Sequence, residues 1–482
     1  MEKFYFKKEI AALKERNLDI TERIIPFAGG QVKLFYILQL TDRPSLSENV
    51  LKPLIQYCSG SENNLSAKKI LDSIIFADDC KLDSDKKKIE EYVLLGMVVI
   101  LLSNDKQYVV INLKTVAHRD VPTPQLTYTV RGPQDCFTEN LDTNLSLIRY
   151  RITDKNIQIK KYELGKRTKT EVAVIYIEDI VNKTVVQEIQ ERIKTIDVDG
   201  IGESGELQSF LLNNKMEFFP NIGLVERSDM AFHSLLEGKV LVLVDGSGVA
   251  LLAPKTFPEF FHSCDDRYDN KFFGFFARCI RYLAILIAFT SSSLFVAITS
   301  FHTDVLPSKY AIALAEMRIS VPFSAFIGAL ILETIVELLR EALLRVPKQI
   351  GPAIGIVGAI VIGQAAVSAG IFSPLLLIIV STSLLASFAI PDYTLVNPFR
   401  ILKFILLIFT ASMGFFGFTL FLTFVLIELV SLDSFGVPYM APWAPFKAYD
   451  FKRTLIYNTR TTSKRPNYLN DKDKKRQNVP GK

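Results

Sequence analysis

Five charged side chains interrupt an apolar stretch between residues 321 and 345 of this 482-residue chain: Glu333, Glu337, Arg340, Glu341 and Arg345. On a helix the three glutamates form a row with a spacing of four residues. Arg340 then lies within reach of Glu337, and Arg345 within reach of Glu341. Because charged groups are costly at membrane depth, such residues face a watery path, a partner or the interface.

This charged helix has two interpretations. In the first, Glu333, Glu337 and Glu341, with Arg340 beside them, form an acidic lining that attracts cations. In the second, residues 321–345 form an amphipathic helix at the membrane interface, and its charges face water. The charges occupy about 140° of the helix circumference at 100° per residue, as expected for an amphipathic helix.

Motifs for enzyme chemistry are absent from the sequence. The residues from Gly200 to Gly205 match GxGxxG, but a helical pattern precedes them where a dinucleotide fingerprint needs a strand, so we expect a loop. The four histidines share no metal-ligand spacing. Asp265 and Asp266 could bind a cation, although a solvated flank is the simpler role. We therefore expect no enzyme, no cofactor and no metal.

Residues 350–391 contain no Asp, Glu, Lys or Arg. This run is twice the ~20 residues that a membrane helix needs, and it breaks near residues 370–374, which predicts helices over 350–369 and 372–390. In the first helix the small residues share one face. Ile362 is the one large residue on that face.

The small face also has two interpretations. Small residues spaced by four allow helices to pack closely, and the residues alone favour this role. Alternatively, copies of the helix surround a pore that Ile362 or its neighbour Val361 closes as a hydrophobic gate. The candidate channel-lining or gate residues are Gly355, Gly358, Ala359, Val361, Ile362 and Gly363.

Charge is distributed unevenly along the chain. Residues 282–446 hold only 15 of the 107 charged side chains, which is typical of a membrane-embedded region. The residues before 282 are nearly balanced in charge and show no basic footprint for nucleic acid. Residues 447–482 hold 11 basic and three acidic side chains, so we expect a cytoplasmic tail that faces lipid headgroups.

Before the membrane region, helix and strand patterns alternate. They predict an α/β cytoplasmic region of two subdomains, at 1–120 and 125–262, with a polar boundary at 118–124. Five scattered cysteines without a CxxC pair suit a reducing compartment. The first residues show no signal peptide, so we expect the N-terminal region to be cytoplasmic.

An all-α polytopic membrane domain is expected at 282–430. Its spans are predicted at 282–301, 350–369, 372–390 and 404–427. Basic residues before the first span and after the last place both ends in the cytoplasm, which requires an even number of crossings. Four crossings plus the amphipathic helix 321–345 satisfy this requirement.

Several short strings resemble a known family, the A subunits of the spore germinant receptors (GerA family). They run in order over residues 125–446 and include Arg131-Gly132-Pro133, Glu226-Arg227, Glu337-Leu-Leu-Arg340-Glu341-Ala342, Gly355-Ile-Val-Gly358, Val361-Ile-Gly363-Gln364 and Ser434-Phe435-Gly436-Val437-Pro438-Tyr439. The first 120 residues resemble the family only loosely. The chain departs from the family pattern at Pro352, Ala359 and Ser228.

This resemblance implies a multi-pass protein of the inner spore membrane. Its partners would be a transporter-like B subunit that binds the nutrient, a lipoprotein C subunit, membrane lipid and further copies of itself. It also implies a ligand-gated cation channel that releases monovalent ions to trigger germination. The alternative is a non-conducting signalling or scaffold subunit that relays nutrient binding from the B subunit. The sequence does not indicate which nutrient is sensed.

Overall fold

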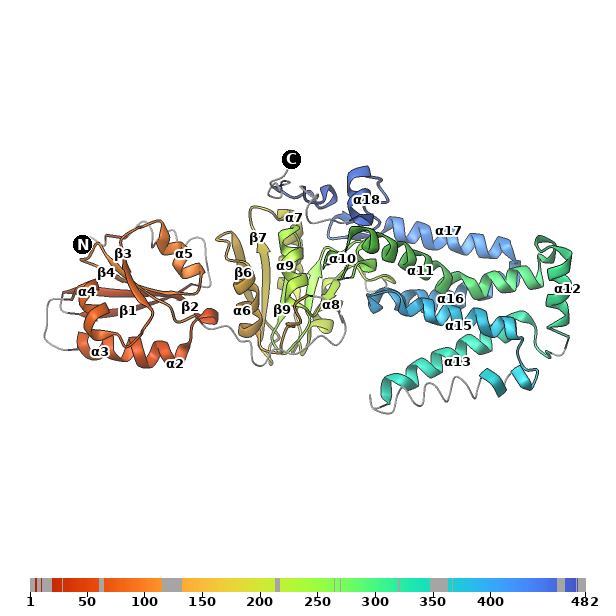
Figure 1. Cartoon of the computed structure of the whole chain (residues 1–482), viewed down its shortest axis with the longest axis horizontal. Helices are drawn as coiled ribbons and strands as arrows, with labels where there is room; N and C mark the ends of the chain where they lie inside the picture. The colour runs from red at the N-terminus through yellow and green to blue at the C-terminus, as the bar shows by residue number, and fades with distance from the viewer. Residues whose placement is uncertain are drawn as a thin grey trace. The chain divides into compact units, whose positions relative to one another are not determined.

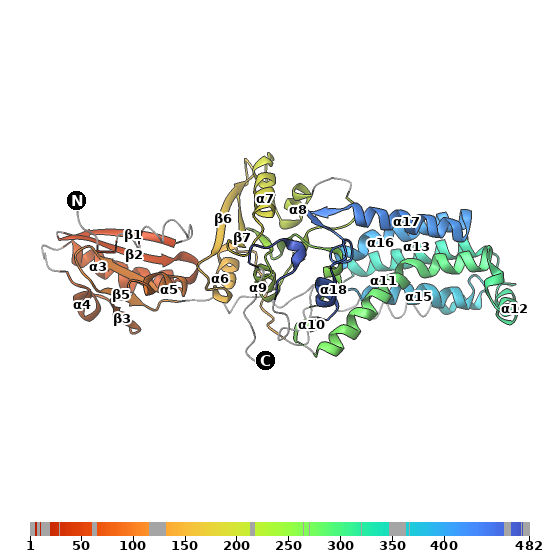
Figure 2. The same ribbon diagram turned by 90° about the horizontal axis from the view of Figure 1, so that it is seen from above.

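The computed structural model describes residues 5–6, 10, 20–27, 29–59, 65–114, 132–212, 217–263, 265–268, 270–319, 321–346, 363–365, 367–456, 464–473 and 475. Contacts divide the chain into two compact units. Unit 1 comprises Met1–Lys215, Ile222–Pro254 and Thr462–Lys482, and unit 2 comprises Met216–Asn221 and Lys255–Thr461. Figures 1 and 2 show two sheets in unit 1 and long helices in unit 2.

The first sheet of unit 1 is antiparallel throughout, with the strand order β1-β2-β4-β5-β3. Successive residues of a strand point to opposite faces. Val98 and Ile100 therefore pack with Leu54 on one face, whereas Val99 packs with Val93 on the other. Helices thus cover both faces. The elements are β1 (Ile20–Phe27), β2 (Gly30–Ile37), α2 (Arg43–Ser45), α3 (Lys52–Cys58), α4 (Ala67–Lys69), β3 (Cys80–Asp83), α5 (Lys88–Leu94), β4 (Val98–Leu102) and β5 (Tyr108–Ile111).

The second sheet is also antiparallel, with the order β6-β7-β9-β10-β8. Leu145 and Leu235, from α6 and α9, pack on one face. Every residue of β9 is buried, so the other face is covered as well. The elements are α6 (Leu141–Arg151), β6 (Ile157–Leu164), β7 (Thr170–Ile177), α7 (Lys183–Thr195), α8 (Ser204–Leu211), β8 (Gly223–Val225), α9 (Ser228–Leu236), β9 (Val240–Val244) and β10 (Ala250–Ala253).

Unit 2 is helical. The long helix α11 packs against α13, α15, α16 and α17, and α16 packs against α17 (Figures 1 and 2). Its elements include α10 (Asp265–Tyr268), α11 (Lys271–Ser300), α12 (Ser308–Glu316), α13 (Ala325–Arg345), α15 (Pro374–Phe388), α16 (Tyr393–Met413), α17 (Phe415–Ser431), the strands β11 (Asp433–Ser434) and β12 (Val437–Pro438), and α18 (Ala448–Leu455). The predicted fold class, a two-part helix-and-sheet region followed by a helical region, is confirmed.

Two helices of the described part of the chain, α11 and α16, are long and apolar enough to cross a membrane. The apolar helices α15 and α17 are shorter. Helix α11 begins at Lys271, well before the span expected at 282–301, while α13 and α15 lie within the expected 321–345 and 372–390. Most of 350–369 lies outside the described residues, as does the predicted boundary at 118–124.

The run 404–427 differs from the single span that its composition predicts. It belongs to two helices, α16 and α17, which meet at Gly414. Gly414 has φ +60° and ψ −138°, a conformation that side chains with a Cβ rarely adopt. A Cβ at this position would also lie 3.0 Å from Cβ of Phe301. Hydropathy does not register such a turn, because glycine does not interrupt an apolar run.

The basic tail, 447–482, also differs from expectation. Its first part forms α18 in unit 2. Its described later residues belong to unit 1, where Tyr468 and Leu469 are buried and the Leu469 carbonyl accepts a hydrogen bond from Asn182. Part of the tail therefore packs on protein and does not simply face lipid headgroups.

Candidate functional site

Glu333 of α13 is a deeply buried carboxylate of the helical unit, with only 1% of the residue exposed. The ammonium of Lys403 on α16 lies 2.5 Å from Oε2 of Glu333. Its Oε1 accepts a hydrogen bond from the hydroxyl of Ser292 on α11. Lys403 is itself buried, so this ion pair is closed off from solvent. Three helices therefore meet at one carboxylate.

A second ion pair lies one turn along the same two helices. The guanidinium of Arg400 on α16 donates through Nε to Oε2 of Glu337 on α13 at 2.9 Å, and its Nη2 bonds the same oxygen. The glutamates are four residues apart on α13, and their partners are three apart on α16 in the reverse order. Residues three or four positions apart lie on the same face of a helix, so the two glutamates face their two basic partners across the antiparallel pair α13 and α16.

Arg340 extends this row toward α15. Its Nη2 donates to Oγ of Ser387 at 3.0 Å, and its guanidinium lies 5.4 Å from the ring centre of Phe388. By contrast, Glu341 is exposed and pairs with Arg345 at 2.7 Å. We call the inward-facing set the charged seam. It consists of Ser292, Glu333, Glu337, Arg340, Ser387, Arg400 and Lys403.

The charged seam changes both interpretations of the sequence. Glu333 and Glu337 do not face water as on an interfacial helix; Glu341 does. Nor do the two carboxylates form an open acidic lining within one chain, because Lys403 and Arg400 neutralise them. With Arg340, the seam holds three cations against two anions, a formal charge of +1. It joins α13 to α16.

Sequence reasoning missed Arg400 and Lys403. They directly precede the run 404–427 and read as the positive flank of a membrane span. Helix α16 instead begins at Tyr393, which places both residues inside it. The available signal was their spacing: Arg400 and Lys403 are three residues apart, and Glu333 and Glu337 are four apart, so each pair lies on one face of a helix.

Of the candidate gate residues, only Gly363 lies in the described part of the chain. A Cβ added there would lie 3.6 Å from Cδ2 of Leu377 on α15, an ordinary packing distance. Gly355, Gly358, Ala359, Val361 and Ile362 lie outside the described residues. The pore and packing interpretations of their helix therefore both remain predictions.

A second polar cluster lies in unit 1. Arg151 donates through Nε to Oγ of Ser228 at 2.8 Å and through Nη2 to both carboxylate oxygens of Asp135. Burial by itself would raise the pKa of Asp135, but the hydrogen bonds from Arg151 and Ser228 outweigh it and lower that pKa. Next to it, buried Arg227 forms a two-pronged pair with Asp229. Ser228 is thus part of the subdomain's polar core.

Two other sequence candidates have structural roles. The GxGxxG string follows α7 and forms a loop up to Glu203, as predicted, but its last two residues begin α8. The Gly202 and Gly205 amides donate to the carboxylates of Glu206 and Glu203. Acid side chains of the same segment thus accept the hydrogen bonds of these two amides. Asp266 is no solvated flank, because it is buried and accepts hydrogen bonds from Arg278 and Arg281.

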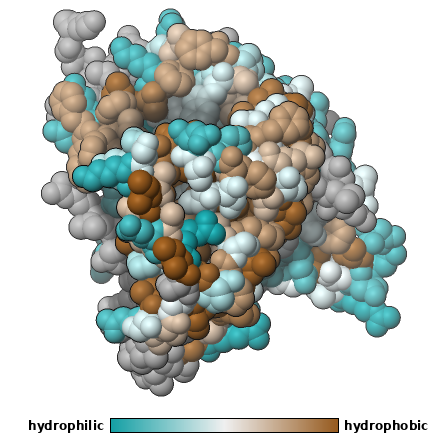
Figure 3. All heavy atoms as spheres, turned by 90° about the vertical axis from the view of Figure 1, so that its right-hand side faces the viewer, coloured by the Kyte–Doolittle hydropathy of each residue, from teal (hydrophilic) through white to brown (hydrophobic). Residues whose placement is uncertain are grey.

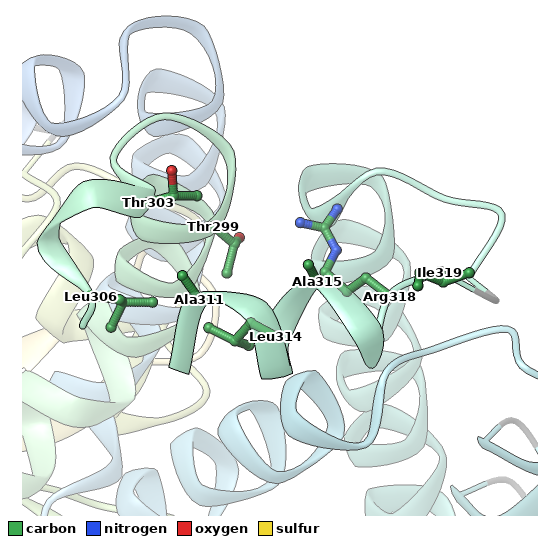
Figure 4. A pocket seen from close by; sticks show the side chains of 8 residues that line it. All are labelled: Thr299, Thr303, Leu306, Ala311, Leu314, Ala315, Arg318 and Ile319. Carbon is green, nitrogen blue, oxygen red and sulfur yellow. The ribbon is translucent and has the colours of Figure 1, made fainter. Parts of the chain in front are cut away.

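One cavity of about 270 Å³ lies near the end of α11 and along α12. Figure 4 shows Thr299 and Thr303 on one side of it and Arg318 on another. Figure 3, which faces this end of unit 2, shows hydrophobic and hydrophilic residues interspersed over the surface. Arg318 is the single charged residue of the lining, so no acid–base pair is present there. Within the described residues, no group of three or more His, Cys, Asp or Glu side chains could hold a metal.

Comparison with known proteins gives extensive matches. The family model described as Bacillus/Clostridium GerA spore germination protein matches residues 6–468. Spore germination protein B1 of Bacillus subtilis (strain 168) is 38% identical over 448 residues, which cover 92% of this chain and 91% of the relative. Spore germination protein GerLA of Bacillus cereus is 34% identical over 473 residues, which cover 98% and 96%.

A solved structure also aligns with part of the chain. It is the N-terminal domain of the A subunit of the Bacillus megaterium spore germinant receptor GerK3. The alignment covers 52% of this chain and 93% of the solved chain, with 23% sequence identity and a TM-score of 0.38. The family assignment rests on the sequence matches, which span nearly the whole chain. The chain belongs to the GerA family of spore germination proteins.

Proposed function

We propose that this chain is the A subunit of a nutrient germinant receptor in the inner spore membrane, and that its copies assemble into a ligand-gated channel for monovalent cations. The observation that carries the proposal is the family match over residues 6–468. The proposed partners are a transporter-like B subunit, a lipoprotein C subunit and further copies of this chain. Nutrient binding would open the channel and release ions.

The helices support a proposed topology of six crossings. The split at Gly414 turns the five apolar segments of the sequence into six: α11, α13, α15, α16 and α17 of the structure, and the span that the sequence predicts at 350–369. An even number leaves unit 1 and the basic tail on one side, the cytoplasmic side by the charge rule. Helix α13 counts as a crossing because its 21 residues extend about 31 Å and its central glutamates are paired.

The gate is tested by ion flux. Ile362→Ala or Val361→Ala removes bulk from the proposed hydrophobic constriction, so either variant should leak monovalent cations without a nutrient. The measurement is potassium release from liposomes that contain the purified receptor. Ile356→Ala, on the opposite face of the predicted helix, is the matched control and should resemble the parent protein. If neither gate variant exceeds this control, the gate assignment is wrong.

The second candidate function is a non-conducting signalling or scaffold subunit. The charged seam favours it, because Glu333 and Glu337 each have a basic partner within the same chain and form no open acidic path. The number of copies in detergent separates the two candidates. A shared pore requires an oligomer, which light scattering of the purified protein would detect. A strict monomer would support the scaffold and exclude the shared pore.

A further inference from the structure

The first turns of α11 expose an unusual number of aromatic side chains. Phe272, Phe273 and Phe276 are 71%, 61% and 60% exposed. They lie before the apolar span predicted from residue 282, in the part of α11 that the sequence did not assign to the membrane. Large exposed apolar surfaces on a protein mark a place where a partner or lipid binds.

The opposite side of the same turns holds buried charge. Arg278 is 2% exposed, donates through Nε to Asp266, and donates through Nη1 to the carbonyls of Thr454 and Leu455 at the end of α18. A helix that faces water shows the reverse arrangement, with arginine outside and phenylalanine inside. The pattern of α11 is the one expected where the outer face contacts an apolar medium.

This exposed stripe is continuous with the span itself. Phe272, Phe276, Leu283 and Leu286 are all exposed and lie along one side of α11. From Phe272 to Leu286 the stripe extends about 21 Å, and the whole 30-residue helix extends about 45 Å against a hydrocarbon core of ~30 Å. The first turns of α11 therefore suit the headgroup region.

Helix α18 adds a second exposed face at the same level, since its last carbonyls bind Arg278. Phe446 and Tyr449 are 66% and 43% exposed there, and Lys452 is also exposed. Lys447 and Arg453 flank this face, and Lys271 begins α11. Residues 271–280 and 446–456 contain a single acid, Asp450, and it is buried. The outward charge is therefore basic.

We propose that residues 271–280 and 446–456 form a collar that binds anionic phospholipid at the bilayer surface. The phenylalanines and Tyr449 insert between acyl chains near the headgroups, and the lysines attract the lipid phosphates. The basic charge and the continuity with the span favour lipid over a protein partner. This inference rests on the proposed membrane location of unit 2.

Single tryptophan reporters test the collar in the full-length protein reconstituted in vesicles. The sequence has one tryptophan, so Trp443→Phe gives a clean background. Phe276→Trp reports the collar, Leu286→Trp reports the span, and Phe76→Trp, in unit 1 and 71% exposed, is the water-facing control. The collar reporter should show blue-shifted emission and be quenched by phosphatidylcholine brominated near the headgroup.

The reporters separate the possible failures. Quenching of Leu286→Trp without quenching of Phe276→Trp overturns the collar and leaves the membrane location intact. No quenching at either position overturns both. A blue shift of Phe276→Trp without quenching by lipid overturns the collar in favour of a protein partner or a second copy. Emission like that of Phe76→Trp means that water covers the phenylalanines.

The lipid charge is tested separately. Brominated phosphatidylglycerol at equal mole fraction should quench Phe276→Trp at least about twofold more than brominated phosphatidylcholine, because the lysines enrich anionic lipid around the collar. The double substitution Lys271→Glu and Lys452→Glu should remove this preference and leave the quenching of Leu286→Trp unchanged. Equal quenching by both lipids in the parent protein would overturn the anionic preference.

Discussion

The pairing of Glu333 with Lys403 is the residue-scale feature that defines the helical unit. Both side chains are buried, and Ser292 supplies a further hydrogen bond to the carboxylate. Burying two charges costs desolvation energy that their attraction offsets only when the geometry and hydrogen bonds are good. Removing one partner leaves the other charge buried and alone, which is the most costly state.

Breaking this pair should therefore destabilise the protein strongly. Lys403→Met should lower the free energy of unfolding by about 3–5 kcal/mol, whereas Glu333→Gln combined with Lys403→Met should recover part of that loss. Thermal unfolding in detergent measures both. Glu341→Gln is the matched control, because its exposed pair with Arg345 contributes at most about 1 kcal/mol.

A different ranking would contradict this view of the seam. If Lys403→Met and Glu341→Gln shift the melting temperature equally, Glu333 and Lys403 do not form a buried pair in the folded protein. If the double variant is no more stable than Lys403→Met, the carboxylate does not need a cation partner, and the seam holds α13 and α16 by other contacts.

At the scale of elements, the turn at Gly414 decides how many helices the apolar run contains. Its positive φ ends α16 and starts α17 within one residue. Nearby, Gly417 of α17 approaches the backbone so closely that a Cβ would lie 2.1 Å from the carbonyl oxygen of Phe409. Glycine at these two positions lets α17 turn back along α16.

Replacing Gly414 should disturb this hairpin through both conformation and crowding. Gly414→Ala should destabilise the protein by more than the ~1–3 kcal/mol that a sparsely populated φ/ψ conformation costs alone, because its Cβ also meets His302 at 2.9 Å. Gly436→Ala is the control: Gly436 has φ +76° with no atom within 4 Å of the added Cβ. Melting temperatures compare the two, and equal shifts would show that crowding at Gly414 is absent.

At the scale of the whole molecule, the chain leaves unit 1 after Pro254 and re-enters it at Thr462. The returning segment is held by Arg465, which donates through Nε to the carbonyl of Leu236 and through Nη1 to Asp473. The amide of Lys472 donates to the carbonyl of Ile180. A Cβ on Gly238 would lie 2.3 Å from Oδ1 of Asp471, so the segment approaches this turn closely.

Removing the Arg465 guanidinium should release the returning segment from unit 1. Arg465→Ala should increase amide hydrogen exchange of residues 464–473 by about tenfold or more, because hydrogen bonds to a charged group contribute about 1.5–3 kcal/mol. Mass spectrometry of the intact receptor measures the exchange. Lys472→Ala, which removes an exposed hydrogen bond to Glu178, should change it little. Unchanged exchange in Arg465→Ala would mean that other contacts hold the segment.

Much of the fold was predictable because its signals are local. The runs that form β4, β5 and β9 are continuous and apolar, and the paired turn residues between β9 and β10 mark a hairpin. The composition of the apolar runs predicts the apolar helices. For the site, the sequence identified the α13 charges but left Arg400 and Lys403 outside the predicted span 404–427, because hydropathy begins a span only after the last charged residue, whereas α16 begins at Tyr393.

The sequence by itself determined the order of elements, the apolar helical region and the family, since these depend on composition and short patterns. Tertiary structure decided that Glu333 meets Lys403, 70 residues away, that Arg278 turns inward while its neighbouring phenylalanines turn outward, and that the tail returns to unit 1. The physical reason is that charge pairing and burial depend on which helix faces meet, and distant segments bring those faces together only in the folded chain.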